Sequence, residues 1–308
     1  MGSAAAARRD WEAIIELALA EDIGHGDVTT LATVPAGTMA GATLLAKGAG
    51  IISGLDPAAF TFLRVDPAVA FEPLCADGAA VPAGTIIARL TGPARSLLGA
   101  ERVALNLLQR LSGVATLTAA FVAETAGTKA RIVDTRKTTP GLRTLEKAAV
   151  RHGGGRNHRV GLTDGVLIKD NHLAAVGGPR RVTDAIRAAR AFAPHTLRIE
   201  VETTTLAEVA EAADAGAEII MLDNMDLGTM RRAVALVAGR ALVEASGNVR
   251  LDTVRAIAET GVDLISVGAL THSAPALDIS LNFDLRQHLV HPDEVGSGLI
   301  DGTLPSSE

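Results

Sequence analysis

The stretch RIEVETTTLAEVAEAADAGAEIIMLDNMD, residues 198–226, contains the repeating unit that decides the fold. A short run rich in apolar and β-branched residues at 198–202 is followed by a helical pattern at 205–215 and by a second such run at 218–222. Short runs of this kind, each followed by a helix, are typical of parallel strands that are covered on both faces. The stretch therefore predicts a strand, a helix and a second strand parallel to the first.

The same unit recurs through the second half of the chain. Further runs lie at 130–134, 166–169, 241–245 and 263–267, and further helical patterns at 142–151, 180–192, 226–238 and 250–260. Connections between parallel strands of one sheet are almost always right-handed, which leaves a barrel or a doubly wound sheet. Because six runs fall short of the eight strands of a complete barrel, we expect an open, incomplete α/β barrel.

The first part of the chain has a different pattern and is predicted to form a separate N-terminal domain, residues 1–113. It combines a one-sided helical pattern with short extended runs between Gly- and Pro-containing turns, at 10–22, 42–46, 69–72 and 85–90. A long helical pattern from Ser96 to Glu124 is interrupted at Ser112–Gly113, so we place the boundary there. The barrel domain then covers 114–281, the segment at about 282–300 returns to the first domain, and 301–308 form a polar tail.

The composition excludes several classes of protein. The chain has 308 residues, of which 48% are hydrophobic and 21% charged, so we expect a large hydrophobic core. Its net charge of −6 argues against a general nucleic-acid binder. The lone Cys75 cannot form an internal disulfide, and no apolar run reaches the roughly 18 residues of a membrane span. The N-terminal stretch also lacks the apolar core of a signal peptide. We therefore expect a cytoplasmic protein with no membrane partner.

One segment, residues 131–159, runs against the acidic balance of the chain. It contains eight Arg and Lys residues and two acidic ones, a local net charge of +6. A cationic segment in an acidic protein indicates a site for an anionic ligand. The helical spacing of Arg143, Lys147 and Arg151 also fits a solvated basic helix face, but that explanation does not account for the cations outside the helical pattern.

Polar side chains or glycine follow every predicted strand of the barrel. In a parallel α/β barrel the carboxyl ends of the strands share one rim, and ligands bind there. Taken singly, Lys169 or Glu202 also fits half of a structural ion pair, and Asp223 fits a helix cap. Together they predict one site, where we expect these residues to converge: Arg136, Lys137, Lys169, Glu202, Asp223, Ser246 and His272.

The residue types at these strand ends indicate phosphorylated substrates. The turns at 246–247 and 268–269 carry small residues, which let backbone amides and a helix N-terminus approach a phosphate. Glu202 and Asp223 offer carboxylates to ribose hydroxyls or to a Mg²⁺ ion that holds a diphosphate. The Arg and Lys side chains suit further anionic groups. A phosphorylated sugar with Mg²⁺, beside a second substrate that carries carboxylates, fits this set of residues.

The segment DTRKTTPGLRTLEKAAVRHGGGRNHRVGLTDGVLIKDNH, residues 134–172, resembles the signature of the quinolinate phosphoribosyltransferase family. EDIGHGDVTT (21–30), GAERVALNLLQRLSG (99–113), VETTT, MLDNMD, EASGNV and VGALTHS are also similar to that family. The resemblance implies an N-terminal α/β sandwich domain followed by an open α/β barrel. It also implies the reaction: phosphoribosyl transfer from phosphoribosyl pyrophosphate to quinolinate with decarboxylation, which gives nicotinate mononucleotide, pyrophosphate and CO₂ in NAD biosynthesis.

The resemblance further implies a role for each matching residue. Quinolinate would be bound by Arg136, His158, Arg159 and Lys169, together with Arg102 from the partner subunit of a homodimer or larger assembly. Phosphoribosyl pyrophosphate would be bound by Lys137, Glu202, Asp223, Ser246, Gly247, Gly268 and His272. Lys169, Glu202 and Asp223 would be catalytic, with Mg²⁺ on the diphosphate near Glu202 and Asp223. No organic cofactor is expected.

Other functions compatible with these residues stay open. A related pyrophosphorylase with a different acceptor, such as one of molybdenum metabolism, would keep the phosphate residues and change the acceptor pocket. A barrel aldolase would use Lys169 to form a Schiff base, which borohydride traps. A non-catalytic quinolinate-binding protein would bind quinolinate tightly without turnover.

Overall fold

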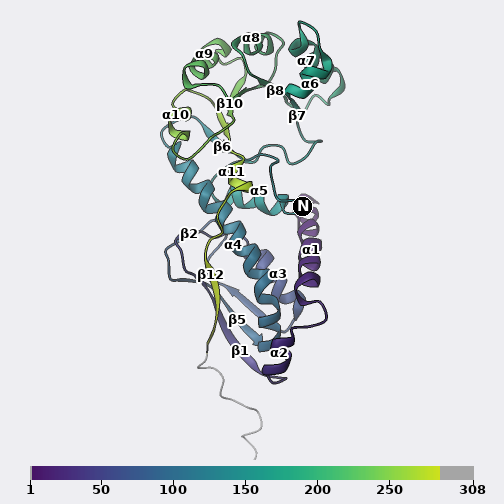
Figure 1. The fold of residues 1–308 in the computed structure, drawn as a ribbon, viewed down its shortest axis with the longest axis vertical. Helices are drawn as coiled ribbons and strands as arrows, with labels where there is room; N and C mark the ends of the chain where they lie inside the picture. Colours follow the sequence, from purple (N-terminus) through teal and green to yellow (C-terminus); the bar gives the residue numbers. More distant parts are fainter. Residues whose placement is uncertain (1, 285–308) are drawn as a thin grey trace, which may run out of the picture.

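The computed structural model describes residues 2–284, with side chains from Trp11 onward. The molecule is elongated, and one long helix, α4 (Ala94–Glu124), runs from its antiparallel part into its parallel part (Figure 1). The first helix, α1 (Gly2–Ile23), is longer than the predicted 10–22 and packs Trp11 edge-on against Phe60, with ring centroids 5.3 Å apart.

The N-terminal part is an α/β sandwich, as predicted. Its antiparallel sheet has the order β12-β1-β5-β3, formed by Ile279–Asp284, Met39–Ala46, Thr85–Pro93 and Ala70–Pro73. Buried side chains of this sheet pack against α3 (Leu55–Val65) and the first half of α4. The helix α2 (Val28–Thr33) and the short pair β2 (Gly50–Ile51) and β4 (Ala80–Val81) complete this part. The predicted return of the chain is seen in β12, which pairs with β1.

The boundary predicted at Ser112–Gly113 falls inside α4, which continues without interruption. Both residues are buried, and a side chain at Gly113 would collide with the carbonyl of Pro275. The small residues therefore serve close packing against the chain that leaves the barrel, rather than a break in the helix. Of the C-terminal predictions, residues 285–300 and the polar tail at 301–308 lie outside the described residues.

The second part is an open parallel barrel, which confirms the predicted fold. Its six strands have the order β6-β11-β10-β9-β8-β7 and span Arg131–Val133, Leu264–Ser266, Leu242–Ser246, Ile219–Asp223, Ile199–Thr203 and Val166–Ile168. The first strand pairs with the last and not with β7, so the barrel stays open between β6 and β7 within residues 2–284.

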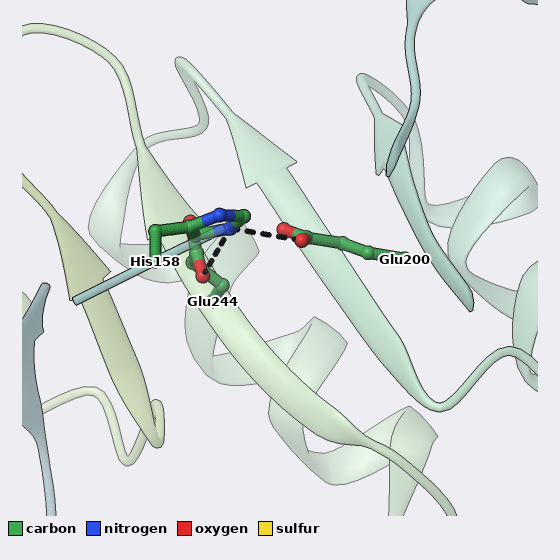
Figure 2. A group of neighbouring side chains, drawn as sticks. All are labelled: His158, Glu200 and Glu244. Carbon is green, nitrogen blue, oxygen red and sulfur yellow. Dashed lines mark ion pairs between the residues drawn. The ribbon is translucent and has the colours of Figure 1, made fainter. Parts of the chain in front are cut away.

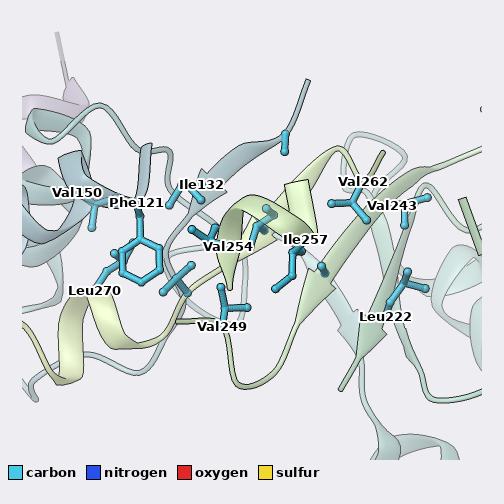
Figure 3. Close-up of a cluster of buried hydrophobic side chains, with 14 of the residues drawn as sticks. Phe121, Ile132, Val150, Leu222, Val243, Val249, Val254, Ile257, Val262 and Leu270 are labelled. Carbon is cyan, nitrogen blue, oxygen red and sulfur yellow. The ribbon is translucent and has the colours of Figure 1, made fainter. Parts of the chain in front are cut away.

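Helices cover the outside of this sheet (Figure 1). They are α6 (Asp170–Val176), α7 (Arg181–Phe192), α8 (Leu206–Asp214), α9 (Leu227–Val237) and α10 (Val254–Ala258), whereas α5 (Arg143–His152) and α11 (Ala269–His272) lie beside α4, where the two parts meet. The core between sheet and helices includes Phe121 of α4, Ile132 of β6 and Leu270 of α11 (Figure 3). No described helix is long and apolar enough to cross a bilayer.

Candidate active site

The register of the parallel strands directs one row of side chains into the open barrel. Ser246 lies opposite Asp223, and Glu202 lies opposite Met221. Because strand side chains alternate between faces, Glu202, Asp223 and Ser246 point to the same side. There they line a cavity of about 980 Å³ at the carboxyl ends of the strands.

Almost all the residues predicted for the site line this cavity. They are Arg136, Lys137, His158, Arg159, Lys169, Glu202, Asp223, Ser246, Gly247, Gly268 and His272. Arg102 is the exception: it is exposed on α4, outside the cavity of its own chain. The cavity also contains residues that the sequence did not single out for the site, among them Glu244, Asn224, Arg250 and Ser266.

The turn after β10 has a shape that depends on glycine. Gly247 has a φ of +90°, and a side chain there would collide with that of Asn224. The next residue, Asn248, also has a left-handed backbone, with φ of 48°, a conformation that Asn tolerates better than most residues. Its side-chain amide donates to Asn224 Oδ1 at 3.0 Å. Asn224 therefore packs closely against the turn, which a side chain at position 247 would prevent.

The three residues with alternative structural explanations, Lys169, Glu202 and Asp223, all line the cavity. Lys169 Nζ donates to Glu202 Oε2 at 2.9 Å, so the predicted site residues also form an ion pair. Asp223 does not cap the next helix: Asp226 caps α9 by accepting the amide of Thr229 at 3.0 Å. Asp223 instead accepts the side-chain amide of Asn224 at 2.8 Å at the rim.

A buried ion pair between Lys147 and Asp134 holds the backbone of His158. Lys147 is only 2% exposed, and its Nζ lies 2.5 Å from Asp134 Oδ1. The same carboxylate oxygen accepts the His158 amide at 2.8 Å, while Lys147 donates to the His158 carbonyl at 3.1 Å. Burial lowers the pKa of Lys147, although the hydrogen bond and charge of Asp134 oppose that shift. We call this arrangement the His158 clamp.

The His158 clamp corrects one explanation drawn from the sequence, the solvated basic helix face. Arg151 is exposed and Arg143 is half-buried, but Lys147 points into the protein. Helical spacing alone does not show which side of α5 faces the core, and a lysine that pairs with a buried aspartate has the same spacing as a solvated one.

A second buried acid, Glu146, fixes the loop that carries Arg136 and Lys137. Its carboxylate accepts the Thr139 amide at 3.0 Å and the Thr139 hydroxyl at 2.8 Å, and Arg110 donates to it at 2.9 Å. Arg110 is on α4, so the helix that joins the two parts also braces a loop of the site.

Deep in the barrel, His158 lies between two acidic side chains (Figure 2). Its Nε2 is 2.9 Å from Glu200 Oε2 and 3.7 Å from Glu244 Oε2. The sequence reasoning missed both glutamates, although a signal was present: each is an acid flanked by apolar residues inside a strand run, IEV and VEA. We call His158, Glu200 and Glu244 the floor cluster.

In addition to the acidic floor cluster, basic side chains gather at two places in the cavity. Arg136 and Arg159 lie close enough that burial and the charge of Arg136 lower the pKa of Arg159. Lys137 and His272 approach the turn at Gly268, where a side chain would contact both. This arrangement can hold two anionic groups, one at the paired arginines and one at the glycine turns.

Comparisons with known proteins agree with this geometry. The family models described as "Quinolinate phosphoribosyl transferase, N-terminal domain" and "C-terminal domain" match residues 27–112 and 114–282. A chloroplastic nicotinate-nucleotide pyrophosphorylase [carboxylating] of Oryza sativa is 47% identical over 294 residues, covering 89% of this chain and 78% of that protein. A probable one of Synechocystis is 49% identical over 268 residues, covering 85% and 89%.

Solved structures show the same fold. NadC from Streptococcus pyogenes has a TM-score of 0.83 and 44% identity, covering 88% of this chain and 95% of that one. The nicotinate-nucleotide pyrophosphorylase from Francisella tularensis has a TM-score of 0.84 and 38% identity, covering 90% and 96%.

Proposed function

This chain belongs to the quinolinate phosphoribosyltransferase family, and we propose that its cavity carries out the reaction of that family. The chain is a decarboxylating phosphoribosyltransferase of NAD biosynthesis: it transfers phosphoribosyl from phosphoribosyl pyrophosphate to quinolinate and releases CO₂, pyrophosphate and nicotinate mononucleotide. One observation carries the assignment of the site: residues from separate strand ends line a single cavity of about 980 Å³.

The charges of the cavity fit two anionic substrates that repel each other. Arg136, Arg159 and Lys169 supply positive charge for the two carboxylates of quinolinate, and Arg provides a bidentate fork for each. The turns at Gly247 and Gly268, with Lys137 and His272, suit the phosphate groups of the second substrate. Fixed cations in this cavity offset the repulsion and align the reacting atoms.

The chemistry then proceeds from this alignment. The ring nitrogen of quinolinate attacks C1 of the ribose, and pyrophosphate leaves. Glu202, held by Lys169, and Asp223 face the cavity from neighbouring strands, where their carboxylates orient the ribose hydroxyls or stabilise positive charge at C1. The positively charged ring nitrogen then stabilises the electron pair that stays on C2 when the 2-carboxylate leaves as CO₂, and C2 takes up a proton.

Mg²⁺ is part of the proposal, as the companion of the diphosphate. Of the two predicted ligands, Asp223 fits better, because it lies half-buried at the rim and accepts a neutral amide from Asn224, whereas the cation of Lys169 already holds Glu202 at 2.9 Å. When bound, Mg²⁺ neutralises charge on the diphosphate. The other steps depend on the side chains described above.

The assembly and location of the protein are also proposals. Arg102 is exposed on α4 and outside its own cavity, so we propose that it enters the cavity of a partner subunit in a homodimer. We also propose a cytoplasmic location. We propose no nucleic-acid partner, which the net charge of −6 supports. Plant relatives are named chloroplastic or mitochondrial, so location varies among relatives.

The test is a turnover assay with quinolinate, phosphoribosyl pyrophosphate and Mg²⁺, in which nicotinate mononucleotide and CO₂ are measured. We expect nicotinate mononucleotide and CO₂ in equal amounts. When nicotinate replaces quinolinate, we expect no CO₂. Quinolinate binding without product would support a binding protein instead. Activity with another acceptor only would support a different pyrophosphorylase, and a borohydride-trapped adduct at Lys169 would support an aldolase.

A further inference from the structure

Two asparagines at the rim of the cavity share a backbone conformation that residues other than glycine rarely adopt. Asn224 has a φ of 53° and Asn248 a φ of 48°, and Ala238 is the other non-glycine residue of the described chain with a positive φ. Ala238 has the common role of ending a helix, α9. The two asparagines instead follow the neighbouring strands β9 and β10 and line the cavity. Backbone strain of this kind is concentrated at functional sites.

The side chains of these asparagines connect the turn after β10 to Asp223. Asn248 Nδ2 donates to Asn224 Oδ1 at 3.0 Å, and Asn224 Nδ2 donates to Asp223 Oδ2 at 2.8 Å. Because an ionised carboxylate only accepts hydrogen bonds, Asn224 turns its nitrogen to Asp223 and its oxygen to Asn248. The direction of both hydrogen bonds is therefore fixed. We call Asn248, Asn224 and Asp223 the rim relay.

The backbone holds Asn224, the middle member of the rim relay, between the two strands. Its amide donates to the Ser246 carbonyl at 3.0 Å, which continues the pairing of β9 with β10 beyond Asp223 and Ser246. Its side chain packs against Gly247, where any added side chain would collide with it. The position of Asn224 thus depends on the turn at Gly247–Asn248, and the orientation of Asp223 depends on Asn224.

The rim relay holds one oxygen of Asp223 and leaves the other available. Asn224 occupies Oδ2, and no residue in the described part of the chain donates to Oδ1. The amide of Asn224 is neutral, so it orients the carboxylate without cancelling its charge, whereas Glu202 is held by the cation of Lys169. A charged carboxylate in one fixed orientation suits Mg²⁺ or a ribose hydroxyl.

We propose that Asn224 is a positioning residue for phosphoribosyl pyrophosphate, and that it couples the turn at Gly247–Asn248 to the carboxylate of Asp223. This inference rests on the proposed function, in which the turn takes a phosphate group and Asp223 takes Mg²⁺ or the ribose hydroxyls of the same substrate. A phosphate at the turn fixes Asn248, Asn248 fixes the amide of Asn224, and Asn224 holds Asp223. Both asparagines are exposed in the open cavity, where water competes for their hydrogen bonds. The rim relay therefore contributes most once the substrate covers it.

Glycine distinguishes this proposal from a role of the asparagines in backbone shape alone. Glycine adopts a positive φ readily, so Asn224→Gly and Asn248→Gly keep the turn and remove only the side chains. If the asparagines serve only the backbone, both variants should bind the substrate as wild type does. Ala238→Gly is the matched control, because it also replaces an exposed left-handed residue, but outside the cavity.

The first experiment measures binding of phosphoribosyl pyrophosphate with Mg²⁺ to the full chain by calorimetry, without quinolinate, so that no transfer occurs. We expect Kd to rise about tenfold in Asn224→Gly, which loses a hydrogen bond to a charged group, and about threefold in Asn248→Gly. Ala238→Gly should have the Kd of wild type. The melting temperatures without ligand should stay within about 2 °C of wild type, because the side chains are exposed.

The second experiment asks whether Asn248 acts through Asn224. In the double variant Asn224→Gly with Asn248→Gly, Kd should equal that of Asn224→Gly alone, because the second substitution removes a hydrogen bond whose acceptor is already absent. Two losses of affinity that multiply would overturn the coupling, since Asn248 would then contact the substrate independently.

Steady-state rates separate the two substrates. In Asn224→Gly, KM for phosphoribosyl pyrophosphate should rise with Kd, while KM for quinolinate should change by less than twofold, because Arg136 and Arg159 do not contact the rim relay. A wild-type Kd in Asn224→Gly would overturn the proposal, as would an equal rise in KM for both substrates. A wild-type protein that forms no nicotinate mononucleotide would instead contradict the proposed function.

Discussion

The His158 clamp makes Lys147→Met a sharp test of how the site is built. The substitution keeps the length and apolar stem of the side chain but removes Nζ, so Asp134 stays buried without its cation and the His158 carbonyl loses a donor. Removing one partner of a buried ion pair costs about 3–5 kcal/mol. At the 2–4 °C per kcal/mol of large domains, the melting temperature should fall by roughly 6–20 °C.

The same variant should selectively weaken the binding of quinolinate. Asp134 and Lys147 hold His158, and Arg159 follows it, so the loop loses its fixed position at the acceptor end. We expect KM for quinolinate to rise at least tenfold, and KM for phosphoribosyl pyrophosphate to change less than twofold, because Lys137 and the turn at Gly247 are untouched. Initial rates with one substrate varied at a time give both values.

Two further variants separate the effect on the position of the His158 loop from the effect on the stability of the protein. Asp134→Asn combined with Lys147→Met removes both buried charges, so it should recover most of the melting temperature while KM for quinolinate stays high. Lys129→Met removes a lysine from an exposed pair with Asp263 and should change the melting temperature by less than the buried variant does. A Lys147→Met protein with wild-type melting temperature and wild-type KM for quinolinate would refute the reasoning.

Three other predictions follow from the site. Because folding raises the pKa of Glu244 to about 8, the stability of wild type falls as pH rises from about 4.5 to 8, by up to about 1.4 kcal/mol per pH unit. The melting temperature of Glu244→Gln should therefore rise relative to that of wild type across this pH range. A constant difference between the two melting temperatures would contradict the shifted pKa. Gly247→Ala should raise KM for phosphoribosyl pyrophosphate more than tenfold, since the new side chain collides with Asn224, and an unchanged value would show that the turn does not contact phosphate. Mixing Arg102→Ala chains with Lys169→Ala chains should restore part of the activity in verified mixed dimers, whereas no recovery would argue against shared sites.

The rim of the barrel was predictable because parallel strands impose a simple rule. Every carboxyl end in such a sheet lies at the same edge, so a list of residues after each strand, such as Lys169 and Asp223, is already a list of neighbours. The strand runs themselves were visible as short apolar segments. The opening between β6 and β7 followed from the number of strands, which is too small for closure.

Features that depend on packing were not predictable in the same way. Lys147 has the spacing of an exposed lysine, and only the approach of Asp134 shows that it is buried. Glu200 and Glu244 meet because their strands flank β9 in the sheet, an order that no local pattern encodes. Gly113 suggested a helix break, because the sequence does not distinguish a glycine that ends a helix from one that lets a neighbouring backbone pack closely against it.

The continuous helix α4 has a consequence for the folding of the whole chain. Its 31 residues form a rod about 46 Å long whose two ends are embedded in different hydrophobic cores. A cut at the point where the sequence suggests two modules would sever this rod at its middle and expose apolar surface on both fragments. The two halves are therefore expected to melt as one cooperative unit, and neither is a promising fragment to produce alone.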